Sequence, residues 1–243
     1  TLLPGEEKTY TFKVYVGPKG YTHLKNLGFN LEESINFGLF SFLGKFVFNV
    51  LKYFYKITGN YGWSIVLLTM CLQVFFFPLS IKSFKASMAM KKLQPQIKII
   101  QTKYKEDPKR LNVELMNLYK TSGTNPFGGC LPMLLQIPVF WALFTTLRNA
   151  FELRGAPFIF WITDLSMHDP FFVLPILMGA GMLLQQKLTA VSADPNQARM
   201  MMFMPVIFTF MFLKFPAGLV LYWFTNSLLT MTGQFIFMKR QKT

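Results

Sequence analysis

The sequence predicts an all-α membrane protein with five transmembrane helices, one amphipathic helix at the membrane interface and a helical hairpin outside the membrane. The first observation is hydrophobic grouping: 52% of the 243 residues are hydrophobic, and they lie in runs nearly free of charge. Such a run crosses a bilayer as a helix when it reaches about 20 residues. The second observation is the net charge of +14, because ten of the 25 Lys and Arg residues lie within residues 82–120, between two such runs.

Five runs have spanning or near-spanning length and little charge, so each is predicted to form a transmembrane helix. Pro78 lies near the end of the first run and predicts a kink there. A Phe-Pro-Ala-Gly turn at residues 215–218 separates the last two runs. The five predicted spans are residues 60–80, 129–147, 171–187, 200–214 and 217–238.

Residues 31–59 are predicted to form an amphipathic helix that lies in the membrane interface. Apolar residues recur at helical spacing between residues 37 and 54, but Lys45, Lys52 and Lys56 interrupt them. A further membrane span is the alternative. Three lysines favour a helix lying among the lipid headgroups, and Gly59 with Asn60 is expected to end it.

Residues 81–122 predict an antiparallel helical hairpin. Asp107 and Pro108 form a turn signal at its centre, with helical patterns on both sides. Both arms carry a thin apolar seam, and their other face is mostly lysine. The segment is too long for a simple connection between two spans.

Residues 1–30 predict the tail of an extramembrane β domain that is mostly missing from this chain. Residues 10–16 alternate between apolar and polar side chains, and Gly17 with Pro18 closes the pattern, which is typical of a strand. A single strand cannot bury itself. The chain also begins at Thr1 rather than Met, so we expect a fragment of a longer protein.

The distribution of Lys and Arg predicts the orientation of the spans. Positively charged loops stay on the cytosolic side. This rule places the hairpin, the 189–199 loop and the C-terminus inside, and the N-terminal region and the 148–170 loop outside. Lys45, Lys52 and Lys56 weigh against this assignment but are outnumbered. We therefore interpret the charge as an orientation signal and expect no specific nucleic-acid partner.

The residues that most often carry catalysis or bind metals form no recognisable cluster. Cys71 and Cys130 fall at different predicted depths and are expected to be free thiols. His23 and His168 are far apart, and the loop containing His168 lacks a nucleophile-turn signature. We expect neither an enzyme nor a metal or other cofactor.

Polar side chains inside the predicted spans mark the candidate site. Such residues are costly at bilayer depth and by default face protein or water. Single residues can hydrogen-bond across helices at about 1–2 kcal/mol or less. Four spans carrying polar residues at similar depth favour a polar cavity open to the cytosol. The candidate residues are Thr69, Gln73, Gln136, Gln185, Tyr222, Asn226, Thr230 and Gln234.

Two observations argue against an ion-coupled transporter. No Asp, Glu, Lys or Arg lies in the middle of a predicted span, although such residues mark ion pathways and proton relays. Inverted repeats typical of transporters are not recognisable either. A small-solute transporter or channel with a cytosolic vestibule nevertheless remains the alternative function, and a structural scaffold is a third.

Many ordered segments resemble the YidC/Oxa/Alb family of membrane insertases, covering nearly the whole chain from about residue 31. Residues 4–30 resemble the end of a periplasmic domain found in Gram-negative members. The segments that carry the resemblance are 60–65, 69–79, 93–95, 118–120, 125–132, 136–138, 151–154, 161–165, 203–208 and 215–222.

The resemblance implies a five-helix core with a hydrophilic groove open to the cytosol and to lipid, an amphipathic periplasmic helix and a cytoplasmic helical hairpin. It implies insertion and folding of membrane proteins in the bacterial inner membrane, alone or with the Sec translocon, without a cofactor. The implied partners are nascent membrane proteins, with ribosomes or anionic lipids at the basic hairpin. The N-terminal region would be periplasmic and the C-terminus cytoplasmic.

Gln73 departs from the pattern of the family. Members usually carry an arginine in the groove between the positions of Thr69 and Pro78, where this chain has glutamine. Glutamine can hydrogen-bond and hold water but carries no charge for an acidic segment. We expect a hydrated groove that is weaker for acidic clients.

Overall fold

The computed structural model describes the backbone of residues 7–12, 14–35, 37, 41–125, 128, 131–189 and 195–240. The chain divides into two compact units, Thr1–Ile35 and Asn36–Thr243. Each unit is described by itself below.

The first unit contains the helix α1 (Tyr21–Leu27) and the short 3₁₀ helix η1 (Leu31–Ser34). The hydroxyl of Tyr15 donates to the carbonyl of Pro18 at 3.0 Å. The described residues of the predicted strand at residues 10–16 pair with no other segment, so no strand forms among them in this structure. The prediction that residues 1–30 are the tail of a larger β domain stays a prediction. A strand needs a neighbour to complete its hydrogen bonds, and the described part of this unit supplies none.

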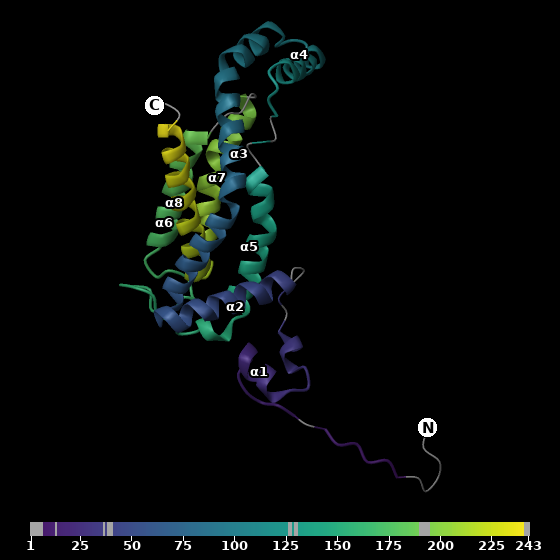
Figure 1. Ribbon diagram of the computed structural model, residues 1–243, viewed down its shortest axis with the longest axis vertical. Helices are drawn as coiled ribbons and strands as arrows, with labels where there is room; N and C mark the ends of the chain where they lie inside the picture. The colour runs from purple at the N-terminus through teal and green to yellow at the C-terminus, as the bar shows by residue number, and fades with distance from the viewer. Residues whose placement is uncertain are drawn as a thin grey trace. The chain divides into compact units, whose positions relative to one another are not determined.

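The second unit is a helical bundle, as predicted (Figure 1). Helix α8 packs against α3 and α6, while α7 packs on α6. Helix α2 packs against α3 and α5, crossing them at one end of the bundle (Figure 1). The described elements of the second unit are α2 (Ser41–Thr58), α3 (Tyr61–Lys103), α4 (Pro108–Thr121), α5 (Leu131–Asn149), η3 (Phe151–Leu153), α6 (Val173–Thr189), α7 (Pro195–Phe212) and α8 (Ala217–Arg240).

The starts of α3 and α4 follow from their capping residues. The side chain of Asn60 accepts hydrogen bonds from the backbone N–H groups of Gly62, at 2.8 Å, and Trp63, at 3.3 Å. Asp107 accepts one from Arg110 N at 3.0 Å, and Pro108 is the first residue of α4. Both arrangements satisfy N–H groups that a helix start leaves unpaired. The predicted helix break at Asn60 and the hairpin turn at Asp107 are confirmed.

No break in the helix separates the predicted first span from the hairpin at residues 80 and 81. One continuous helix of 43 residues, α3, passes through Pro78 and Pro95. Each proline removes one backbone donor, but the helix continues on both sides of each proline. The first arm of the hairpin is therefore an extension of the first span, and Figure 1 shows α3 running beyond the bundle to meet α4.

Other boundaries agree more closely with the predictions. Helix α7 begins at Pro195, before the predicted residue 200, because proline is well accommodated in a first helical turn. The predicted amphipathic helix at residues 31–59 is shorter, since η1 is separate from α2. By length and composition, α3 is the one described helix that qualifies as a membrane span, and Met200–Phe212 is a shorter apolar helix.

The core of the second unit includes a buried cluster where α3, the loop after α5 and the start of α8 meet. All six residues from Ala217 to Tyr222 are buried, together with Ile65 of α3, Leu153 of η3 and Leu165 of the loop. Thr146 of α5 donates to the carbonyl of Gly44 at 3.2 Å, which joins α5 to α2. This end of the bundle is well packed.

Candidate functional site

Helix α8 presents four predicted site residues at intervals of one turn. Tyr222, Asn226, Thr230 and Gln234 are four residues apart and lie along one side of the helix. Tyr222 and Gln234 are buried, at 1% and 3% exposure, whereas Asn226 and Thr230 are half-buried. We call these four residues the polar stripe.

Two residues of the polar stripe form hydrogen bonds to neighbouring helices. The amide of Gln73 on α3 donates to the hydroxyl of Thr230 at 3.3 Å. The amide of Gln136 on α5 donates to the hydroxyl of Tyr222. The structure therefore brings four predicted residues together and makes α8 the polar link between α3 and α5.

Thr69 does not join this network. Its side chain is fully buried, and its hydroxyl donates to the carbonyl of Ile65 on its own helix at 2.6 Å. Gln185 lies half-buried on α6, a helix that also packs against α8. The structure thus places the hydroxyl bond of Thr69 within α3 and Gln185 on a helix that packs against α8.

The C-terminal half of the polar stripe keeps polar atoms without described partners. The oxygen Oε1 of Gln234 is buried and has no hydrogen-bond partner within the described residues. Leaving such an atom unpaired costs about 1–3 kcal/mol, so buried polar atoms of this kind are usually paired with water. Gln234 therefore points to hydration in this half of α8.

The opposite end of α8 is closed by the loop that follows α5. The N–H groups of Ala217 and Gly218 donate to the carbonyls of Met167, at 2.7 Å, and Leu165, at 2.9 Å. These bonds satisfy two of the N–H groups that a helix start leaves free. They also hold the loop over the buried beginning of α8.

Asp169 organises this loop and was missed as a structural residue by the sequence analysis. It is buried, at 1% exposure, and accepts hydrogen bonds from Trp161 Nε1 at 2.9 Å, Phe171 N at 3.1 Å and Leu174 N at 2.7 Å. An aspartate just before an apolar run is a helix-start signal, and that signal was available in the sequence.

Asp164 stabilises a second turn of the same loop. Burial alone would raise the pKa of this carboxyl group, but hydrogen bonds from the side chain and backbone of Ser166 and from further backbone groups hold the pKa below its usual value. Two carboxylates of this loop are therefore held by internal donors.

Small hydroxyl residues also escaped prediction as buried polar groups. They were overlooked because each can donate to the carbonyl one turn earlier on its own helix, so their presence in an apolar run is a weak signal. Ser80 does so, donating to the carbonyl of Phe76 at 3.1 Å. The buried ones on α3, α5 and α8 are Ser64, Ser80, Ser83, Thr146, Thr225 and Ser227.

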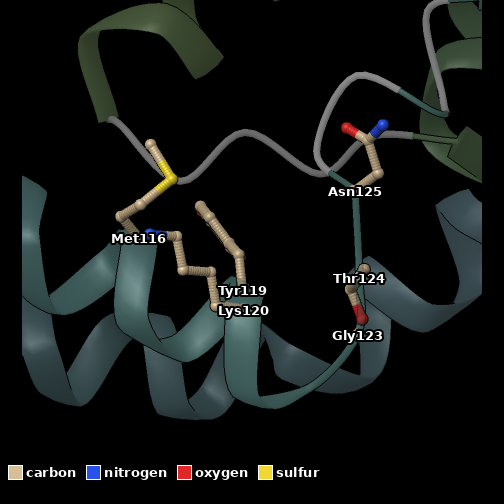
Figure 2. A pocket seen from close by; sticks show the side chains of 6 residues that line it. All are labelled: Met116, Tyr119, Lys120, Gly123, Thr124 and Asn125. Carbon is tan, nitrogen blue, oxygen red and sulfur yellow. The ribbon is translucent and has the colours of Figure 1, made fainter.

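A separate open hollow of about 320 Å³ lies at the end of α4 (Figure 2). Burial raises the pKa of the Tyr119 hydroxyl, which lines it. The hollow lies outside the predicted site. It is lined by Met116, Tyr119, Lys120, Gly123, Thr124 and Asn125.

A metal site and a reactive thiol each have requirements that can be compared with the described residues. Those residues hold no group of three or more His, Cys, Asp or Glu side chains placed to bind a metal ion. Cys71 is an exposed free thiol, whereas Cys130 lies outside the described residues.

The fold and the site define a helical-bundle membrane protein with polar residues on the facing sides of its helices. The model of the 60Kd inner membrane protein family matches residues 53–243, and that of the YidC periplasmic domain matches residues 1–50. The chain belongs to the 60Kd inner membrane protein family.

Relatives in other bacteria are similar over nearly the whole chain. Membrane protein insertase YidC of Endomicrobium trichonymphae is 53% identical over 243 residues, covering 97% of this chain and 47% of the relative. The YidC of Oleidesulfovibrio alaskensis is 49% identical over 248 residues, covering 99% and 46%. The chain therefore spans about half the length of the curated relatives it matches.

A solved structure supports the predicted fold. The crystal structure of an active YidC insertase with its first transmembrane domain resolved matches with a TM-score of 0.68 and 29% identity. The match covers 89% of this chain and 53% of that one. The all-α fold class is thereby confirmed.

Proposed function

We propose that this chain is the membrane-embedded part of a membrane protein insertase and chaperone. The observation that carries the proposal is the polar stripe of α8, hydrogen-bonded to α3 through Gln73 and to α5 through Gln136. Polar groups moved into hydrocarbon without partners cost several kcal/mol each. A hydrated groove along α8 would lower that cost for a polar client segment, while the client's apolar helix partitions into lipid.

The proposed orientation places the hairpin and the C-terminus in the cytosol and the loop after α5 on the periplasmic side. The basic residues of the α3–α4 hairpin support it through the positive-inside rule. The packed beginning of α8 then closes the groove towards the periplasm. The less covered end, with Gln234, opens towards the cytosol of a bacterial inner membrane protein with five spans.

Nascent membrane proteins are the proposed clients, with the Sec translocon as a possible partner in their insertion. The hairpin is the proposed contact for ribosomes or anionic lipids. Helix α4 buries none of its residues, and Lys109, Arg110 and Lys120 lie on it. Exposed basic side chains of this kind attract anionic partners over about 8 Å at physiological salt.

Gln73 is the residue that best tests the groove. Because it donates to Thr230 without carrying charge, we expect it to keep the groove polar but to bind acidic client segments weakly. The test is insertion of short single-span clients, with neutral or acidic translocated ends, into proteoliposomes containing only this protein. Gln73→Leu should lower insertion of both clients, whereas Gln73→Arg should favour the acidic one.

Val74→Leu supplies the matched control, because Val74 is the next residue and is 75% exposed on the apolar surface of α3. It should insert both clients as the parent does. Equal insertion by the parent, Gln73→Leu and Gln73→Arg would refute the role of the groove. Solute flux without crosslinks from positions 73, 136 and 226 to the client would indicate a transporter instead.

A further inference from the structure

The loop between η3 and α6 contains a turn that exposes apolar side chains. Phe158 N donates to the carbonyl of Ile162 at 2.9 Å, and Ile162 N donates to that of Ile159 at 3.2 Å. At the centre of this turn, Phe160 is 87% exposed and has a φ of 51°. The left-handed region is disfavoured for so bulky a side chain. We call residues 159–161 the aromatic tip.

The aromatic tip is held by contacts on both sides. Asn60 Nδ2 donates to the carbonyl of Phe158 at 3.2 Å, and the rings of Phe158 and Trp63 meet edge to face at 5.6 Å. Trp161 is fixed by its hydrogen bond to the buried Asp169. The exposure of Phe160 is therefore a feature of a braced turn.

The anchor points place the aromatic tip at a definite depth. Asn60 caps α3, which is long and apolar enough to span a membrane, so the tip lies level with the start of that apolar segment. The same loop is bonded to the first residues of α8, and it lies at the end of the bundle where α2 crosses (Figure 1). Aromatic side chains concentrate at this level in membrane proteins.

The charges of the loop suit a phospholipid surface. Arg154 in the loop and Arg148 in the last turn of α5 are exposed, while Asp164 and Asp169 accept internal hydrogen bonds. The two arginines thus present cations for headgroup phosphates, and the carboxylates of Asp164 and Asp169 are held by internal donors.

We propose that the aromatic tip is a membrane anchor that enters the interface of the outer leaflet, with Phe160 among the upper acyl chains. The partner is the phospholipid itself. This inference rests on the membrane placement in the proposed function but does not depend on insertion activity.

The experiment measures depth at the tip in phospholipid vesicles. In a Cys71→Ser, Cys130→Ser background, Phe160→Cys and the control Thr163→Cys each receive an environment-sensitive fluorophore. Thr163 is exposed three residues along the same loop. Quenching is then measured with iodide in water and with lipids spin-labelled high on the acyl chain.

The label at position 160 should be quenched by iodide at least threefold less than the label at 163, and by the lipids at least twofold more. Equal iodide quenching at both positions would overturn the anchor. Protection of position 160 that appears only when a client or second protein is added would assign the tip to a protein partner and also overturn it. If labelling at 160 lowers the unfolding midpoint, Ile159→Cys, whose side chain in the same turn is 38% exposed, replaces that variant under the same criteria.

Discussion

The two ends of α8 differ in how they are covered. At its beginning, Ala217 to Tyr222 are all buried, and the loop after α5 satisfies its first N–H groups. Beyond Tyr222, the described buried side chains are Thr225, Ser227 and Gln234, and Gln234 keeps an oxygen without a described partner. One helix therefore has a fully buried beginning, which we call the closed end, and a partly exposed polar end.

The difference bears on the proposed groove. Tight packing and paired hydrogen bonds supply stability at the closed end. At the polar end the proposed function requires water, which would pair the polar atoms that the described residues leave open. Variants at the closed end should accordingly change stability most, and variants at the polar end should change insertion most.

The largest effect is expected for Asp169→Ala at the closed end. The change leaves the indole of Trp161 and two backbone N–H groups unpaired, so unfolding should become easier by about 3 kcal/mol. Asp169→Asn retains one acceptor oxygen and should lose about half as much. The measurement is the unfolding midpoint in detergent micelles, and an unchanged midpoint for Asp169→Ala would contradict the closed end as the stable part.

The next effect compares two glycines of the same bundle. A Cβ at Gly62 would overlap the ring of Phe158, so Gly62→Ala should destabilise the protein by about 1–3 kcal/mol through overpacking. A Cβ at Gly233, near the polar end, would meet only Phe77 and Phe84 at 3.9 Å. Gly233→Ala should therefore be neutral or slightly stabilising in the same unfolding assay. Equal losses of stability for both variants would contradict the tighter packing inferred around Gly62.

A smaller effect is expected where α8 bonds to its neighbours. A double-mutant cycle of Gln136→Leu and Tyr222→Phe should give a coupling energy of about 1 kcal/mol, within the range known for hydrogen bonds between membrane helices. The matched cycle of Gln73→Leu and Thr230→Val should give less, because that bond is 3.3 Å long and both residues are half-buried. A larger coupling energy for the second pair would contradict the inference that the contacts of α8 are tighter at its closed end than at its polar end.

The sequence was sufficient for most of the helices because their signals are local. Runs of apolar residues, Asn60 as a cap and the Asp107–Pro108 turn each act within a few residues. A continuous helix through residue 80 was not predicted, since proline usually bends or ends a helix. The strand pattern at residues 10–16 was recognisable, but a strand forms only where a partner segment is present.

The candidate site was predictable as a set of residues but not as pairs. A period of four identified the polar stripe, yet the partnership of Gln73 with Thr230 spans 157 positions and depends on how helices pack. The structure also separates Thr69, which bonds its own helix, from the residues that cross between helices. The bracing role of Asp169 depends on Trp161 and on the start of α6, so it required the folded loop.

The smallest effect on stability is expected for Gln234→Leu, at the polar end of α8. A buried amide oxygen without a protein partner contributes little to the fold, so the unfolding free energy should change by less than about 1 kcal/mol. Insertion of a client with a polar translocated end should nevertheless fall, because leucine cannot hold water in the groove. Phe235→Leu is the control. Phe235 is the next residue and its side chain is 61% exposed, so this substitution should change neither the unfolding free energy nor insertion. A loss of 2 kcal/mol or more, with insertion falling only in proportion to the folded protein, would show that Gln234 serves packing and that the polar end of α8 is as closed as its beginning.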